Sequence, residues 1–529
     1  MQTQRNLIHR LSSALAAASL FAAASIGSIK PAQAQALPDF RLPAKTFFEP
    51  STRYKNDRKV FAWYMVCCGP FGGNVQPKPK LIAQYKAEIQ MAQSMGIDGF
   101  GLDIMQANSD YHNAVEALFE AAKELNSGFQ LFFECDYGNP KKTPSDYADL
   151  VRQYGKHANY FKVKGKPLVC AYGADTGGYG LKPAEPVSWW KDSNPYAAIE
   201  WWKENLIAPL KKDRIEVYFV PITWWQLVLG GGTVKSSQEE MAAWGDAAQG
   251  MSMWQIQNSP IGGGLPVLER QGIESHKAGK TWMTSIATHY WWGSYFSIGS
   301  WHWQPGEALK ADNSNRNGKF FEHAGGQGLE AQWVSAMVTQ NADWVMMLTW
   351  NDYNESYIEP IDDYKKYPNG TAQGAPLGWY KPQAGMDELN RYYTQWYKTG
   401  RTPKIIADSI FYSYITHSYK TVAAKDPRPA VSTGNTAPSD NLYVTTALTA
   451  PAKLRVDSGS TTATFDVPAG VTHTVTPFVA GAQTFSLWRD GKKINSVEGE
   501  PVLDKIDFYD YWPTTGYVET LPGDGKRGK

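Results

Sequence analysis

The chain has 529 residues, more than one ordinary domain needs, and 43% of them are apolar, enough for a sizeable core. Its 52 basic and 51 acidic residues give a formal net charge of +1. Nucleic acids and anionic membranes select for basic surfaces, so this balance argues against either as the main partner.

Aromatic residues are unusually frequent, with 21 Trp and 29 Tyr. Several Trp residues come in adjacent pairs, such as Trp201-Trp202, Trp224-Trp225 and Trp291-Trp292. Flat rings stack well on the C–H faces of sugars, but they also fill the core of a large protein. Composition leaves both interpretations open for any single Trp.

The first residues have the pattern of a secretory signal peptide. Arg5 and Arg10 precede an Ala-rich apolar run, and two overlapping A-Q-A sequences then end at Ala34 and Ala36. We expect cleavage after one of these two residues, and therefore a signal peptide over residues 1–36 and a secreted or periplasmic protein. The apolar run is too short to span a bilayer, and no later stretch of the sequence is long enough, so no membrane partner is predicted.

The four Cys residues are Cys67, Cys68, Cys135 and Cys170. An exported protein can form disulfides, but there are only four Cys residues, and none has the spacing of metal ligands. Because Cys67, Cys135 and Cys170 lie in apolar, strand-like segments, we expect them to be buried free thiols.

Near-continuous apolar runs alternate with amphipathic segments from about residue 58 to residue 400, as in strands that are buried on both faces of a parallel sheet. The expected strands are Val60–Cys67, Gly99–Met105, Phe129–Asp136, Pro167–Tyr172, Ile215–Thr223, Met251–Ile256, Trp282–Tyr290 and Trp344–Trp350. Expected helices include Leu81–Met95, His112–Leu125 and Ser145–Tyr154. Eight β-α units predict an α/β protein with a (β/α)8 barrel, and a doubly wound open sheet is the alternative. No dinucleotide fingerprint follows the first strand.

Composition changes after about residue 418, where a Pro-, Ser- and Thr-rich stretch precedes short alternating strands, which predict an antiparallel β-sandwich. The expected domains are a signal peptide (1–36), an N-terminal extension (37–57), a catalytic barrel (58–420), a linker (421–440), a β-sandwich (441–522) and a disordered tail (523–529). The sandwich is expected either to buttress the barrel or to bind glycan on its own.

Carboxylates and aromatic residues follow several predicted barrel strands, at the end where barrel enzymes place their catalytic groups. Asp352 and Glu355 are three residues apart, just beyond the eighth strand. Glycoside hydrolysis needs one carboxylic acid to protonate the leaving oxygen and one carboxylate to activate water or attack carbon. The alternative is structural, because a strand-end Asp often caps a turn and a loop Glu is usually solvated.

The segment LTWNDYNESYIEP resembles the signature T-W-N-D-Y-G-E-S of glycoside hydrolase family 71, the α-1,3-glucanases or mutanases. Other stretches agree with it, namely KVFAWYMV, MAQSMGIDGFGLDI, FQLFFECD, DELNRYYTQWYKTGRTP and, in the β region, APAKLRVDSG and VPAGVTHTVTPFVAGAQTFSLWRDGK. The resemblance therefore covers roughly residues 58–500. It implies a (β/α) barrel and inverting, endo-acting hydrolysis of α-1,3-glucan without a metal or other cofactor. Asp352 and Glu355 match the two catalytic carboxylates, and we prefer Glu355 as acid and Asp352 as base. Asn354 stands where the family usually has Gly.

The expected substrate-binding residues gather near the predicted strand ends. They are Trp63, Asp103, Asp136, Tyr172, Trp224, His289, Tyr290, Trp350, Asn351 and Tyr353. His289 fits a structural role as well as a substrate contact. The sequence therefore predicts a monomeric enzyme whose partner is a polysaccharide. Hydrolysis of another α-glucan or an α-mannan, and a non-catalytic glycan-binding barrel, remain alternatives.

Overall fold

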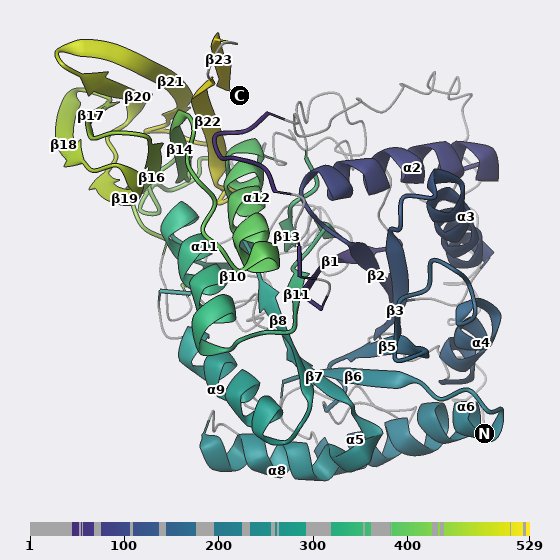
Figure 1. Cartoon of the computed structure of the whole chain (residues 1–529). Coiled ribbons are helices and arrows are strands. Elements are labelled where there is room, and N and C mark those ends of the chain that lie inside the picture. The colour runs from purple at the N-terminus through teal and green to yellow at the C-terminus, as the bar shows by residue number, and fades with distance from the viewer. Residues whose placement is uncertain are drawn as a thin grey trace, which may run out of the picture. The chain divides into compact units, whose positions relative to one another are not determined.

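Figure 1 shows the computed structural model of the chain, which describes residues 45–528 with gaps. The gaps are 52–53, 56, 68–75, 106–108, 137–143, 176–194, 225–232, 255–259, 262–263, 293–318, 353–354, 361–380, 382, 426–431, 434–437, 508 and 522–524. The predicted signal peptide, Tyr353, Asn354 and half of the predicted linker lie outside the described residues.

Eight parallel strands close into a barrel in the order β1, β2, β3, β5, β6, β7, β8 and β11, and β11 pairs back onto β1. They are β1 Lys59–Met65, β2 Gly99–Ile104, β3 Gln130–Asp136, β5 Lys166–Tyr172, β6 Tyr218–Thr223, β7 Gly250–Met253, β8 Thr281–Ile286 and β11 Trp344–Met347. The short β4, Lys162–Val163, forms a hairpin with β5. The ring confirms the barrel and excludes the open sheet.

Helices surround the barrel strands (Figure 1). They are α2 Lys78–Ser94, α3 Ser109–Leu125, α4 Pro144–Tyr154, α5 Pro195–Trp202, α6 Ala208–Lys212, α8 Val234–Trp244, α9 Gly264–Lys277, α11 Gly325–Val334 and α12 Ala384–Thr399. Segments Lys203–Ile207 and Ser335–Thr339 continue α5 and α11 as π-helix, and Gly245–Ala247 follows α8 as a 3₁₀ turn. In α2, buried Leu81, Tyr85, Ile89 and Ala92 recur every three or four residues, which is the spacing of one apolar helix face.

Two antiparallel sheets form the C-terminal domain, one in the order β19-β16-β14-β22-β23 and one in the order β18-β17-β20-β21. The strands are β14 Asp408–Tyr414, β16 Asn441–Leu448, β17 Ala452–Ser458, β18 Thr461–Val467, β19 Gly470–Pro477, β20 Gly481–Arg489, β21 Lys492–Val502, β22 Thr514–Leu521 and β23 Gly525–Gly528. Phe485 of one sheet stacks on Tyr412 of the other at 4.9 Å, inside a shared apolar core. The predicted β-sandwich is confirmed.

The predicted domain limits need two corrections. β14 lies inside the range assigned to the barrel, yet it pairs with β16 and β22 at the centre of a sandwich sheet. β23 lies inside the predicted disordered tail and pairs with β22. Both errors arise because the partner strands are far away in sequence or were not predicted themselves.

Short elements join these regions. β10, Lys319–Phe321, pairs with β9, Tyr290–Trp292, and with β15, Ser432–Thr433, which falls within the predicted linker. In the N-terminal extension, Phe47 is fully buried between Tyr392 of α12 and Phe411 of β14. The extension therefore belongs to the folded core from at least this residue.

The thiol prediction is right for two residues and wrong for one. Cys135 and Cys170 are free and buried, but Cys67 is disulfide-bonded. Cys67 lies in a turn after β1, not in the buried strand that the prediction assumed. Within the described parts of the chain, no helix is long and apolar enough to cross a bilayer.

Candidate active site

Asp352 and Glu355 flank one tight turn at the carboxyl end of the barrel. β12, Asn351–Asp352, pairs antiparallel with β13, Ser356–Tyr357, and the Glu355 amide donates to the Asp352 carbonyl at 3.0 Å. The Thr349 hydroxyl accepts from the Asp352 amide at 2.7 Å and donates to the Ser356 carbonyl at 2.6 Å. A turn of this kind holds its first and fourth α-carbons within about 7 Å of each other. Both carboxylates therefore start from one small, cross-braced hairpin.

The position of this hairpin differs from the prediction in one respect. The eighth barrel strand, β11, ends at Met347, before the predicted end at Trp350. The two carboxylates thus stand on a separate hairpin beyond the strand. The conclusion that they sit at the carboxyl end of the barrel is unchanged.

Two neighbouring strands, β1 and β9, hold the catalytic hairpin, residues 351–357, in place. The Asn351 side chain accepts from the Met65 amide at 2.7 Å and donates to the Met65 carbonyl at 3.2 Å. The Trp350 amide donates to the Trp63 carbonyl at 2.7 Å, which adds a second tie to β1. The Trp291 amide of β9 donates to the Glu355 carbonyl at 3.0 Å. Both catalytic candidates are thereby fixed through the backbone to rigid elements.

An aromatic cluster lies at the ends of the neighbouring strands. The Tyr172 ring lies 5.7 Å from Trp63, 5.6 Å from Trp224 and 4.8 Å from Trp254, and Trp63 and Trp254 are 5.0 Å apart. Trp224 and Trp254 each come directly after a strand, β6 and β7. The three Trp rings are nearly buried, and Tyr172 is half-buried. The structure therefore brings together three of the predicted substrate-binding residues.

Trp254 belongs to this cluster but is absent from the predicted site. It stands one residue past β7, just as Trp224 stands one residue past β6. The prediction placed it inside a strand that ran to Ile256, which hid this relation. The recurrence of Trp directly after successive strands was the signal that would have found it.

Acidic residues lie on the adjacent strands β2 and β3. Asp103 is buried and pairs in register with Glu134, whereas Asp136 is half-buried at the last position of β3. Burial, followed by the charges of Asp103 and Asp136, raises the pKa of Tyr111, so its hydroxyl stays protonated beside both carboxylates. This part of the candidate site therefore holds two carboxylates beside one protonated hydroxyl.

Glu134 is fully buried below this acidic group. Burial raises its pKa well above the usual carboxyl range, although a hydrogen bond with the Cys170 thiol opposes the shift, so the neutral acid is favoured. A Cβ on Gly101 would lie 2.6 Å from the Glu134 Oε1 atom. Only glycine at this position of β2 leaves room for the acid inside the barrel.

No group of three or more His, Cys, Asp or Glu side chains in the described residues is arranged to hold a metal ion.

The sequence profile of Glycosyl hydrolase family 71 matches residues 56–287 and 313–526. The chain belongs to glycosyl hydrolase family 71. It is therefore a glycoside hydrolase.

Two relatives match this family 71 enzyme over most of both chains. A mutanase of Penicillium rubens is 26% identical over 483 residues, which cover 89% of this chain and 90% of the relative. A glucan endo-1,3-alpha-glucosidase of Schizosaccharomyces pombe is 25% identical over 474 residues, which cover 87% and 95%.

Solved structures give weaker likenesses. The family 99 endo-alpha-mannosidase of Bacteroides thetaiotaomicron has a TM-score of 0.41 and 15% identity, covering 65% of this chain and 96% of that one. The endo-beta-1,4-mannanase of Thermotoga petrophila has a TM-score of 0.40 and 11% identity, covering 86% and 99%. The barrel of the family 71 enzyme is established by its own strand pairing.

His289 and Tyr290 are not at the end of a barrel strand as predicted, because β8 already ends at Ile286. Burial, then the neighbouring His323, lowers the pKa of His289 well below its usual value, so the ring is neutral. Its Nε2 accepts from the Tyr357 amide at 3.4 Å, and its Nδ1 lies 2.9 Å from the Thr288 hydroxyl. These contacts favour the structural role for His289.

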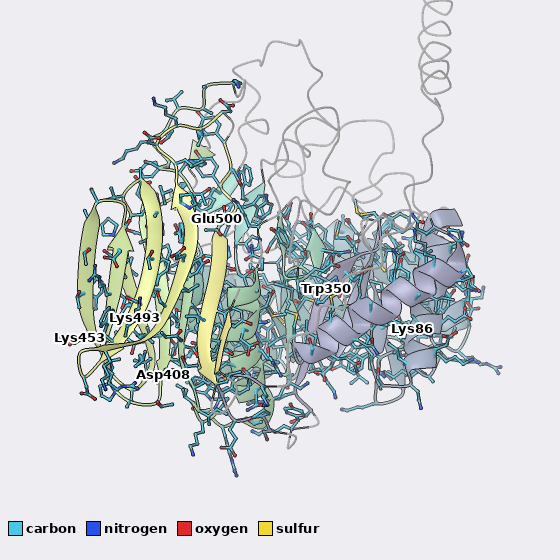
Figure 2. The ribbon with its side chains drawn as sticks, turned by 90° about the horizontal axis from the view of Figure 1, so that it is seen from above. Lys86, Trp350, Asp408, Lys453, Lys493 and Glu500 are labelled. Carbon is cyan, nitrogen blue, oxygen red and sulfur yellow. The ribbon has the colours of Figure 1, made fainter. Side chains whose placement is uncertain are left out.

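Three other predicted contacts are also buried. Tyr290 packs on Phe321, its pairing partner between β9 and β10, and Asn351 holds the catalytic hairpin as described. Trp350 packs against Phe100, and its indole lies beside Glu88 of α2. Figure 2 labels Trp350 close to this helix. The three residues therefore pack beneath the candidate site and support it. A direct sugar contact by any of the three stays an untested prediction.

Proposed function

We propose that this family 71 enzyme hydrolyses α-1,3-glucan by an inverting mechanism in which Asp352 and Glu355 are the catalytic pair. The observation that carries the proposal is the single tight turn that presents both carboxylates at the carboxyl end of the barrel. The substrate is supported by the two relatives that match nearly the whole chain, a mutanase and a glucan endo-1,3-alpha-glucosidase.

In this mechanism Glu355 is the general acid and Asp352 the general base. Glu355 gives its proton to the glycosidic oxygen as the bond from that oxygen to the anomeric carbon breaks. Asp352 takes a proton from water as the water oxygen bonds to the same carbon from the opposite face. Inversion needs the two carboxyls about 6.5–9.5 Å apart, to admit that water. Side chains that diverge from α-carbons about 7 Å apart can reach this range.

The surrounding residues suit a sugar chain. The cluster of Trp63, Tyr172, Trp224 and Trp254 supplies aromatic rings at the mouth of the barrel, where sugar C–H faces can stack. Asp103 and Asp136 supply acceptors for sugar hydroxyls, and we assign them to substrate binding. A polymer that is longer than the site would be cut internally, which is the endo action that we propose.

The catalytic pair is tested by Asp352→Asn and Glu355→Gln, measured separately as release of reducing sugar from α-1,3-glucan. Each substitution removes a proton-transfer step, so each should lower kcat at least about a thousandfold while the melting temperature stays unchanged. Asp466→Asn, on the exposed face of β18, is the matched carboxylate control and should keep full activity. Full activity of both site variants would refute the assignment.

The linkage is tested by a panel of purified polysaccharides that includes other α-glucans and α-mannans, with sizing of the products. Activity confined to α-1,3-glucan with mixed oligosaccharide products is expected. Faster turnover of another polymer would identify that polymer as the substrate instead. Binding to the polymers without turnover of any of them would favour a non-catalytic glycan-binding barrel.

We also propose that the enzyme is exported as a monomer after removal of a signal peptide that ends at Ala34 or Ala36. The Arg5 and Arg10 start, the Ala-rich run and the A-Q-A sequences support this proposal. N-terminal sequencing of the mature protein should begin at Gln35 or Leu37. An intact Met1 on the protein in its native cell fraction would contradict it.

A further inference from the structure

Trp512 of the C-terminal domain lies where the β-sandwich meets the carboxyl end of the barrel. Its side chain is fully buried, and its ring lies 5.0 Å from His289, 5.4 Å from Trp291 and 5.2 Å from Tyr357. All three rings meet it edge-on, at interplanar angles of 88°, 77° and 66°. One sandwich residue thus fills the space between three barrel side chains that come from two separate segments.

Each of these three residues either contacts the catalytic hairpin, residues 351–357, or belongs to it. Trp291 donates its amide to the Glu355 carbonyl at 3.0 Å. Tyr357 pairs with Asn351 in the hairpin itself, and its amide donates to the His289 Nε2 atom at 3.4 Å. A shift of Trp291 or Tyr357 would therefore move the backbone that carries Glu355.

The sandwich is held firmly enough to transmit such support. The Lys381 Nζ atom, which is nearly buried, lies 2.6 Å from the Glu500 Oε2 atom of β21, and the Lys381 carbonyl accepts from the Tyr357 hydroxyl at 2.7 Å. At the start of α12, a Cβ on Gly385 would lie 2.5 Å from the carbonyl oxygen of Gly516 in β22. Barrel and sandwich are therefore in direct backbone contact, with no room for a flexible hinge at this point.

We propose that Trp512 is a positioning residue for the catalytic turn, so that the β-sandwich is part of the catalytic unit. Without Trp512, Trp291 and Tyr357 lose the ring that they share, and the hairpin is free to shift. A shift of about 1 Å at a catalytic group can cost about a hundredfold in rate. The catalytic part of this inference rests on the proposed function, whereas the structural part does not.

The test compares Trp512→Leu with Phe485→Leu. Phe485 is also a fully buried aromatic residue of the sandwich, but its ring contacts are with Tyr412 and Tyr414. Both variants should lower the melting temperature. Only Trp512→Leu should speed amide hydrogen exchange in the peptides that contain Trp291 and Glu355, because only there is the support lost.

The kinetic arm uses α-1,3-glucan at a temperature well below the melting transition of the variants. Trp512→Leu should lower kcat by about a hundredfold with KM little changed and with a shifted pH profile, since the two carboxyls lose their fixed geometry. Trp512→Phe, which keeps a smaller ring, should lower kcat by a smaller but measurable factor, about tenfold. Phe485→Leu should keep both kcat and the pH profile.

The outcomes separate the two claims. If the wild-type protein does not hydrolyse α-1,3-glucan, the proposed function is wrong. Amide hydrogen exchange then still decides whether Trp512 holds the catalytic hairpin. Unchanged exchange at Trp291 and Glu355 in Trp512→Leu, or equal kcat losses in Trp512→Leu and Phe485→Leu, overturns the inference. If Trp512→Leu does not fold, the same two measurements on Trp512→Phe decide it, with a smaller expected effect.

Discussion

Asn351 offers a sharp test of how the barrel holds its catalytic hairpin. Its buried side chain makes two hydrogen bonds to the backbone of Met65, at 2.7 and 3.2 Å. Each bond contributes about 1 kcal/mol net, and loss of a partner leaves the Met65 amide and carbonyl to find water. Met65 is half-buried, so water reaches it in part. Asn351→Ala should therefore lower the free energy of unfolding by about 2–3 kcal/mol.

The matched control for Asn351 is Asn159→Ala. Asn159 is also nearly buried and also makes two backbone hydrogen bonds, to the carbonyls of Ala122 and Phe129 at 3.4 and 3.0 Å. Those bonds join the end of α3 to the start of β3, at the amino end of the barrel. Urea unfolding should show similar losses for both variants, whereas the assay of sugar release should show a drop in kcat for Asn351→Ala alone. Equal kcat values in the two variants would refute the idea that this clamp positions the catalytic pair.

Three further predictions concern the barrel. Burial raises the pKa of Glu88 to about 8 from 4.5, against the opposing hydrogen bond from Tyr64, so the stability of the wild type should fall as pH rises through that window. Glu88→Gln should make the free energy of unfolding, measured with urea at several pH values, less dependent on pH. An unchanged pH dependence would contradict the raised pKa of Glu88. Gly101→Ala should lower the free energy of unfolding by about 1–3 kcal/mol, because the new methyl group crowds Glu134. A melting temperature equal to that of the wild type would disprove the close approach of residue 101 to Glu134. Trp254→Ala should raise KM for α-1,3-glucan about three- to tenfold with kcat largely kept, and an unaltered KM would remove the aromatic cluster from the substrate path.

The sequence predicted the barrel well because its strands carry their own signal. Runs such as Phe129–Asp136 are apolar on both faces, since one face packs inside the barrel and the other against helices. Phe132 indeed packs on Phe61 of β1, whereas Phe133 packs on Phe119 of α3. The pattern is local, so it can be read without knowledge of the partner strands.

The sandwich limits were harder to predict because their signal is not local. Apart from its first residue, Asp408, every residue of β14 is buried, and its two partners, β16 and β22, lie far along the chain. The sequence of β14 is equally typical of a last strand of the barrel region. Because β14 is central to a sandwich sheet, removal of residues 436–529 would leave it unpaired, and point substitutions test the role of the sandwich more cleanly.

The sequence predicted only part of the site, because only part of it is encoded locally. Asp352 and Glu355 were found through their spacing beyond an apolar run, and the turn between them explains why a separation of three places both at one hairpin. Spacing gave no sign that His289 is held by Tyr357 and covered by Trp512, because those contacts join segments that are distant in sequence. Buried support for a site is a tertiary property, whereas the carboxylates themselves follow a linear motif.

The central claim is that Asp352 and Glu355 hydrolyse α-1,3-glucan by inversion, and NMR of the products during hydrolysis tests it most directly. Wild-type enzyme should release the β-anomer of the new reducing end first, with the α-anomer appearing later by mutarotation, and Asp352→Asn and Glu355→Gln should release neither at a comparable rate. Initial release of the α-anomer would contradict the inverting mechanism, and absence of any release by the wild type would contradict the substrate.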